Sequence, residues 1–94
     1  MSRLDGRAVD DALAELSGWE RDGDAIVREL RFETFRDAIA FIVRVADVAE
    51  AADHHPELAN VYSKVEVRLT SHDVGGITDR DVSLARAIDG VVAV

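Results

Sequence analysis

The sequence predicts an α+β fold, in which an antiparallel β-sheet has α-helices packed on one face, forming a two-layer α/β sandwich. Three observations support this fold class. Apolar residues recur at helical spacing in three segments, an Asp-Gly pair separates two strand-like segments, and residues 61–69 alternate between apolar and polar side chains. The chain has 94 residues, a length that fits one compact domain, so we expect a single domain over residues 1–94.

A first helix and a β-hairpin are expected near the N-terminus. Val9, Leu13 and Leu16 recur at helical spacing, and a glycine two residues later is a typical C-terminal stop. The segments 19–21 and 25–32 flank an Asp-Gly pair, which is a common turn signal between paired strands. The second segment is therefore expected to run antiparallel to the first.

The longest helix is expected to begin after Thr34, whose side chain can cap it, and to end near Asp53. His55 precedes Pro56, and the residue before a proline is disfavoured in helices. Helical spacing places seven residues on one continuous apolar face: Phe35, Ala38, Ile39, Ile42, Val45, Ala46 and Ala49. Two apolar residues fall outside this face, and we expect them to contact another subunit: Phe41 and Val48.

A single strand is expected over residues 61–69, followed by a short last helix. Apolar side chains from Val61 to Leu69 share one side of this strand, and polar side chains occupy the other. Thr78 is expected to cap the last helix, and Gly90 to close it. Strands with one apolar side favour an antiparallel sheet whose helices cover a single face.

The composition excludes several classes of function. The chain has 11 basic and 19 acidic side chains, and its net charge of −8 disfavours binding to nucleic acid or anionic lipid. It has no cysteine, which excludes disulfides, thiolate metal sites and cysteine nucleophiles. No signal-peptide pattern opens the chain and no segment has the length of a membrane span. We therefore expect a cytoplasmic protein with neither nucleic acid nor membrane as a partner.

The three histidines are the strongest candidates for chemistry. His54 and His55 follow the long helix, and His72 closes the long strand on the same side as Tyr62. Glu50 lies four residues before His54, so the two share a face if the helix persists that far. With Asp53 adjacent, these groups are expected to meet at one end of the sheet.

Other roles remain open for the same residues. Trp19 and Tyr62 are also typical packing groups with a polar tip, and Pro56 is also a helix stop. Asp81 lies at the third position of the last helix, where a carboxylate caps backbone donors. Three histidines and a carboxylate are enough to ligate a catalytic zinc, but adjacent histidines rarely face one ion, so we expect no metal.

A spaced set of residues runs from the end of the long helix into the last one: Glu50, Asp53, His54, His55, Pro56, Tyr62, His72 and Asp81. This pattern, together with Gly18–Glu20 and Gly76–Asp81, resembles the signature of the pterin-4a-carbinolamine dehydratases. The resemblance covers nearly the whole chain. It implies an antiparallel sheet with helices on one face. It also implies dehydration of 4a-hydroxytetrahydropterin to quinonoid dihydropterin, without a metal or organic cofactor.

The resemblance also implies a role for each residue. His54 and His72 correspond to the acid/base pair, and His55 to a residue that orients the pterin. Glu50 and Asp53 correspond to positions that support the site, and Trp19 to an aromatic residue that packs on the pterin; for Asp81 we expect a structural role. Members of the family are dimers or tetramers. In animals the fold also serves as a non-enzymatic dimerisation cofactor of a homeodomain transcription factor, which is the alternative function for this chain.

Overall fold

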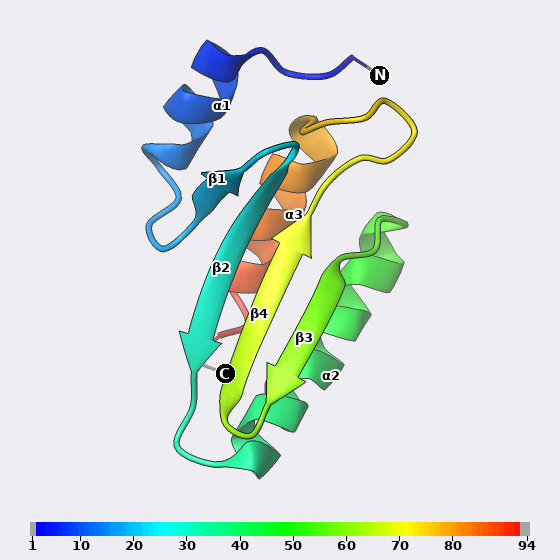
Figure 1. Ribbon diagram of the computed structural model, residues 1–94. Coiled ribbons are helices and arrows are strands. Elements are labelled where there is room, and N and C mark those ends of the chain that lie inside the picture. The colour runs from blue at the N-terminus through cyan, green and yellow to red at the C-terminus, as the bar shows by residue number, and fades with distance from the viewer. Residues whose placement is uncertain (1, 93–94) are drawn as a thin grey trace.

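The structure, a computed structural model, describes residues 2–92. Its elements are α1 (Gly6–Leu13), β1 (Glu20–Asp22), β2 (Ala25–Arg31), α2 (Phe35–Ala52), β3 (Glu57–Val61), β4 (Lys64–Leu69) and α3 (Asp79–Asp89). The four strands form one antiparallel sheet in the order β1-β2-β4-β3. Helices α2 and α3 cover one face of this sheet, and α1 lies beside β1 (Figure 1). The predicted fold class is confirmed.

The helices begin at side chains that cap them. Thr34 accepts a hydrogen bond from the backbone N–H of Asp37 at 3.0 Å, and Asp53, which directly follows α2 as its C-cap, has left-handed backbone geometry (φ 50°). Thr78 and Asp81 form a complete capping box at the start of α3. All three positions agree with the sequence analysis. Within residues 2–92, no helix is both long and apolar enough to cross a membrane.

The sheet contains one strand more than the sequence predicts. The hairpin of β1 and β2 is confirmed, but residues 61–69 are the end of β3, a turn and β4 rather than one strand. The turn lies at Tyr62, whose φ of 52° is unusual for a residue with a side chain. The side-chain amide of Asn60 donates to the carbonyl oxygens of Tyr62 and Lys64 and so stabilises the turn.

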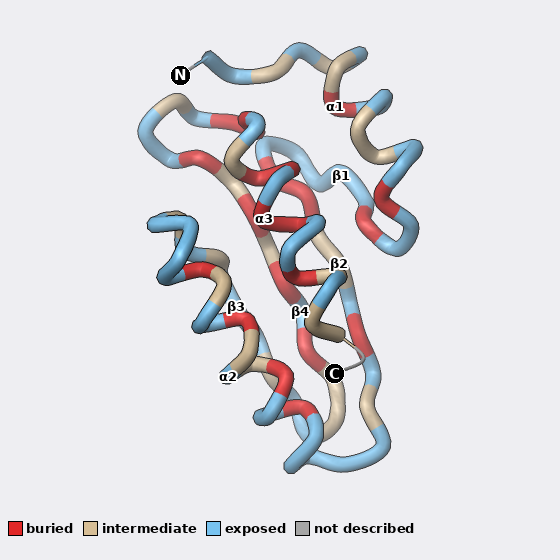
Figure 2. Tube along the Cα trace, turned by 180° about the vertical axis from the view of Figure 1, so that it is seen from behind, coloured by how far each residue is buried: buried red, intermediate tan, exposed pale blue. Residues whose placement is uncertain are grey.

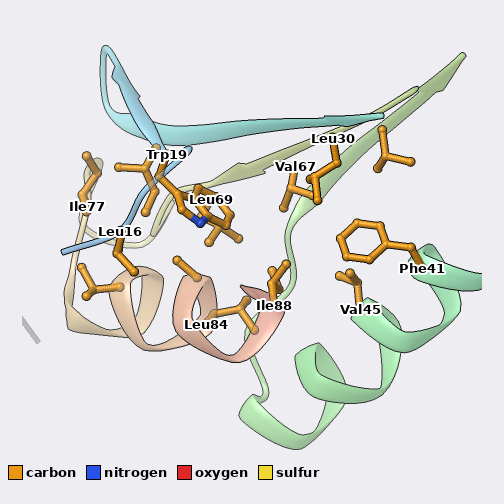
Figure 3. Close-up of a cluster of buried hydrophobic side chains, with 14 of the residues drawn as sticks. Leu16, Trp19, Leu30, Phe41, Val45, Val67, Leu69, Ile77, Leu84 and Ile88 are labelled. Carbon is orange, nitrogen blue, oxygen red and sulfur yellow. The ribbon is translucent and has the colours of Figure 1, made fainter. Parts of the chain in front are cut away.

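The core lies between the sheet and helices α2 and α3, as the buried residues in Figure 2 and the side chains in Figure 3 show. Strand β4 contributes three side chains with no exposed surface: Val65, Val67 and Leu69. Helix α2 contributes Phe41, which is fully buried and packs against Phe32 with ring centroids 5.1 Å apart. The expectation that Phe41 contacts another subunit is therefore wrong.

The buried face of α2 is rotated from the one that the spacing predicts. Its buried residues are Ala38, Phe41, Val45 and Ala49. Phe35 and Ile39, which were expected inside, are 49% and 37% exposed. Val43 is 57% exposed and lies one turn further along the same side of the helix. The helix is therefore apolar over more of its surface than the core of one chain covers.

Candidate active site

The three histidines lie at one end of the sheet. The C-terminal end of α2, the start of β3, the end of β4 and the start of α3 meet at this end (Figure 1). His54 and His55 connect α2 to β3, and His72 follows β4. The topology therefore brings together segments that are distant in the sequence, as expected from the spacing of the histidines.

His54 is held by a buried carboxylate. Its Nε2 lies 2.6 Å from Oδ1 of Asp81, and the two side chains are 10% and 0% exposed. The other oxygen of Asp81 accepts hydrogen bonds from the Ser71 hydroxyl at 2.8 Å and from the Thr78 backbone N–H at 2.9 Å. Asp81 thus both caps α3, as predicted, and positions an imidazole that is distant in the sequence.

Ser71 is a site residue that the sequence analysis missed. Its side chain is fully buried, and its hydroxyl lies 2.8 Å from Oγ1 of Thr78 as well as 2.8 Å from Asp81. Two signals in the sequence point to it. Ser71 has the same parity as the buried Val67 and Leu69, so it is a polar residue at an inward position. It also precedes the loop to Thr78, which the sequence identifies as a helix cap.

Glu50 pairs with His55 rather than with His54. Because α2 ends at Ala52, His54 no longer follows the helical repeat and turns toward Asp81. Nε2 of His55 lies 3.3 Å from Oε2 of Glu50, with side-chain exposures of 58% and 77%. Such an exposed pair orients the ring only weakly. Beside it, Asp53 is exposed and Pro56 is half-buried.

His54 and His72 line different cavities. His54 lines a cavity of about 270 Å³ between α2 and α3. The walls of this cavity include Ala52, Leu84 and Ala87. His72 is exposed and, together with Thr70, lines a second cavity of about 250 Å³. Asp81 contacts His54 and also Ser71, the residue that precedes His72 in the chain.

A larger surface hollow, about 560 Å³, lies on the open side of the sheet, and no histidine lines it. Its walls are mainly acidic: Gly18, Glu20, Arg21, Asp22, Val27, Glu29 and Glu66. Its size alone does not make it the candidate site, because none of the groups suited to proton transfer near neutral pH faces it.

Two aromatic residues of the sequence pattern lie away from the histidines. Tyr62 is at the opposite end of β4 from His72, and the six residues of β4 alone span roughly 20 Å. Trp19 is 4% exposed and lies among the buried side chains of the core (Figure 3). Its Nε1–H donates to Asp89 at 2.8 Å. The expectation that Trp19 packs on a pterin is corrected, because its ring has no free face in the chain.

The described residues near His54 and His72 do not form a set of metal ligands. Among residues 2–92, no group of three histidine, aspartate or glutamate side chains is arranged to hold a metal ion. The carboxylate oxygens of Asp81 already accept three hydrogen bonds. The arrangement is suited instead to moving protons, because an imidazole held by a carboxylate is a typical general acid or base.

One ion pair ties the loop of His72 to the start of α3. Arg80 donates to Asp73 at 2.6 Å, and this hydrogen bond holds the pKa of the Asp73 carboxyl below its usual range. Because the pKa is lower in the folded state, the pair stabilises the fold at pH values above about 4. This contribution is lost as the pH falls through the lowered pKa.

We expect Arg80→Gln to raise the pKa of Asp73 toward its ordinary value, because the substitution removes the guanidinium that favours the ionised carboxyl. A titration of the side-chain carboxyl resonance by NMR measures this shift. Arg86→Gln is the matched control, since Arg86 pairs with Glu15 instead. An unchanged pKa in Arg80→Gln would contradict the assignment.

Comparisons with known proteins identify the family of the chain. The family model described as "Pterin 4 alpha carbinolamine dehydratase" matches residues 2–91. A protein of Thermomicrobium roseum named "Putative pterin-4-alpha-carbinolamine dehydratase" is 50% identical over 94% of this chain and 95% of its own. One of the same name from Bradyrhizobium sp. (strain BTAi1) is 53% identical over 99% of this chain and 96% of its own.

Two solved structures are similar. A transcriptional coactivator/pterin dehydratase from Brucella melitensis has a TM-score of 0.94 at 35% identity and covers 98% of this chain and 100% of its own. A pterin dehydratase-like protein described as a RuBisCO assembly factor in the alpha-carboxysome has a TM-score of 0.66 at 14% identity. It covers 80% of this chain and 87% of its own, and at this identity the likeness shows the fold alone.

Proposed function

Because the chain belongs to the pterin 4 alpha carbinolamine dehydratase family, we propose that it dehydrates 4a-hydroxytetrahydropterins to quinonoid dihydropterins, as a step in tetrahydropterin recycling. The observation that carries this proposal is the buried contact between His54 and Asp81. A scaffold gains little from an imidazole held this way at the edge of a cavity, whereas a proton-transfer site requires one.

The reaction needs two proton transfers at neighbouring atoms of the pterin. The 4a-hydroxyl leaves as water after it is protonated, and the adjacent ring nitrogen loses its proton as the carbon–nitrogen double bond forms. Histidine is suited to both transfers because its ordinary pKa is close to neutral pH. We assign these roles to His54, which contacts Asp81, and to His72, which follows Ser71 in the chain.

The remaining residues of the proposed site support binding. We assign pterin orientation to His55, whose exposed ring is free to meet a ligand beside Glu50. Asp53 and Pro56 shape the turn that delivers both histidines, since the left-handed backbone of Asp53 ends α2 one residue before His54. No cofactor enters this scheme.

The test is a direct assay of dehydration. The 4a-carbinolamine is generated in situ by an aromatic amino acid hydroxylase, and its decay is followed with and without the protein, which is treated with a chelator and freed of it before the assay. We expect strong acceleration that the chelator does not affect. A decay rate equal to that of the uncatalysed reaction would reject the enzymatic proposal and favour a non-enzymatic binding module of the same fold.

We also propose that the chain forms a homo-oligomer through an apolar stripe on α2. The stripe consists of Phe35, Ile39 and Val43, which follow one another at intervals of four residues and are all exposed. Exposed apolar surface of this kind is costly unless another surface covers it. A second copy of the chain is a suitable partner, because two such helices can pack stripe against stripe with two-fold symmetry.

We expect Val43→Glu to shift the protein toward monomer, because the substitution places a charge in the centre of the stripe. Sedimentation over a range of concentrations measures the effect. Ala40→Glu is the control, since Ala40 is exposed on α2 outside the stripe. The proposal fails if the parent protein sediments as a monomer at all concentrations, or if both variants retain the parent's oligomeric mass.

A further inference from the structure

We infer that Asp81, itself held by Ser71, keeps His54 in the tautomer protonated at Nε2, so that Nδ1 is the nitrogen that exchanges protons with substrate. The catalytic half of this inference rests on the proposed dehydratase function. The tautomer itself is a property of the protein without substrate. Ser71 and Asp81 are thus positioning residues that act through His54.

The two oxygens of Asp81 have different partners, and this leaves one oxygen for His54. Oδ2 accepts from the Thr78 backbone N–H at 2.9 Å and from the Ser71 hydroxyl at 2.8 Å. Oδ1 is left for His54, at 2.6 Å from Nε2. A carboxylate can only accept, so Nε2 must carry the proton in this contact. In the neutral ring, Nδ1 then carries the lone pair.

Nδ1 is the free end of the imidazole. It makes no hydrogen bond with the part of the chain that the structure describes, whereas every buried side-chain nitrogen or oxygen in that part has a partner. Nδ1 of His54 must therefore reach solvent. His54 lines the cavity of about 270 Å³ between α2 and α3, so a ligand has space beside the ring.

The hydroxyl of Ser71 donates a hydrogen bond to Asp81 and so helps to fix the carboxylate. Its single proton is donated to Asp81, so in its 2.8 Å contact with Thr78 the donor is Oγ1 of Thr78. Thr78 in turn accepts from the backbone N–H of Arg80 at 3.2 Å. The bonds all run in one direction toward Asp81, an arrangement in which each bond polarises the next.

The substitution Asp81→Asn tests the tautomer directly. The amide oxygen must take the Oδ2 position, because the N–H of Thr78 needs an acceptor there. The NH₂ group then faces Nε2 and donates to it, which forces the proton of His54 onto Nδ1. We expect ¹⁵N NMR of histidine-labelled protein, with the imidazoles neutral, to show Nε2–H in the parent and Nδ1–H in Asp81→Asn.

The resonances of His54 are assigned with His55→Gln and His72→Gln, which remove the other two histidines in turn. An Nδ1–H tautomer in the parent, or the same tautomer in parent and variant, would overturn the inference. Neither result depends on turnover. A parent protein that is inactive but shows the inversion would reject the proposed function and leave the tautomer assignment in place.

Kinetics test the positioning role. We expect Asp81→Asn to lower kcat on the order of 10²–10⁴-fold with little change in KM, as expected when a catalytic imidazole is held in the wrong tautomer. We expect Ser71→Ala to lower kcat about 10–100-fold while leaving the tautomer unchanged, and Ser71→Thr to restore most of the loss. Ser17→Ala, in an exposed turn, is the control. If Asp81→Asn does not fold, the tautomer of the parent protein and the activities of the Ser71 variants test the inference. Full activity in Ser71→Ala would contradict the positioning role of Ser71.

Discussion

His54→Ala and His72→Ala are each expected to lower kcat on the order of 10²–10⁴-fold, because each removes a positioned acid or base from the reaction. Such losses correspond to about 3–5 kcal/mol of transition-state stabilisation. The measurement is turnover of the 4a-carbinolamine generated in situ. Far-UV circular dichroism shows whether each variant keeps the fold.

His54→Gln is the control for His54→Ala, because it keeps a donor for Asp81. His54→Gln places an amide NH₂ where Nε2 donates, so it can satisfy the carboxylate without supplying an acid or base. We expect it to be as inactive as His54→Ala but more stable.

His55→Ala is expected to raise KM more than it lowers kcat, because His55 is exposed and assigned to binding. Near-parental rates for both single variants and for the double variant would contradict the mechanism.

Asp81→Ala is expected to cost about 3–5 kcal/mol of the free energy of unfolding, because each buried donor that loses its acceptor costs about 1–3 kcal/mol. Three donors lose their acceptor in this variant: Nε2 of His54, the hydroxyl of Ser71 and the backbone N–H of Thr78. Because Asp81 has no exposed surface, water does not replace it without local opening.

Urea unfolding followed by circular dichroism measures this loss. Asp79→Ala is the matched control, since Asp79 lies in the same first turn of α3 but is exposed. We expect the control to change stability by less than about 1 kcal/mol, the usual size of a helix-dipole interaction. A loss in Asp81→Ala no larger than in Asp79→Ala would show that the buried network contributes little to the fold.

The elements that the sequence predicted correctly depend on interactions over a few residues. Thr34 and Thr78 bond to backbone N–H groups two or three positions along the chain, and Gly23 supplies a positive φ in the first hairpin. These interactions are complete within one turn of chain. The caps and the first hairpin could therefore be read directly from local residue types.

The turn between β3 and β4 lacked such a local signal. Tyr62 takes a positive φ without being glycine or asparagine, and Ser63 is the one polar residue that interrupts the apolar alternation from Val61 to Leu69. The stabilising contacts come from the Asn60 side chain, which reaches forward to two carbonyl groups. The turn pairs Val61 with Lys64, so Val61 faces the opposite side of the sheet from Val65 and is 68% exposed, although the alternation placed the two on one side. One polar residue in an alternating pattern is too weak a signal to show that one strand ends and another begins.

The orientation of α2 was also beyond the sequence. Apolar residues cover much of the helix, so several stripes satisfy helical spacing equally well. Only packing against Phe32 and the sheet selects Phe41 for the core and leaves Phe35 and Ile39 exposed. The same ambiguity affects Trp19, whose type suits a binding site as well as a core, and which the contact with Asp89 places in the core.

The sequence by itself determined the α+β fold class, most helix ends and the placement of three histidines where elements end, because these follow from residue type and short-range spacing. The tertiary structure decided which carboxylate holds which imidazole. The end of α2 turns His54 away from Glu50 and toward Asp81, and the fold delivers Ser71 to the same carboxylate. Hydrogen bonds between side chains depend on atoms within about 3 Å, and only the packing of separate elements brings such atoms together.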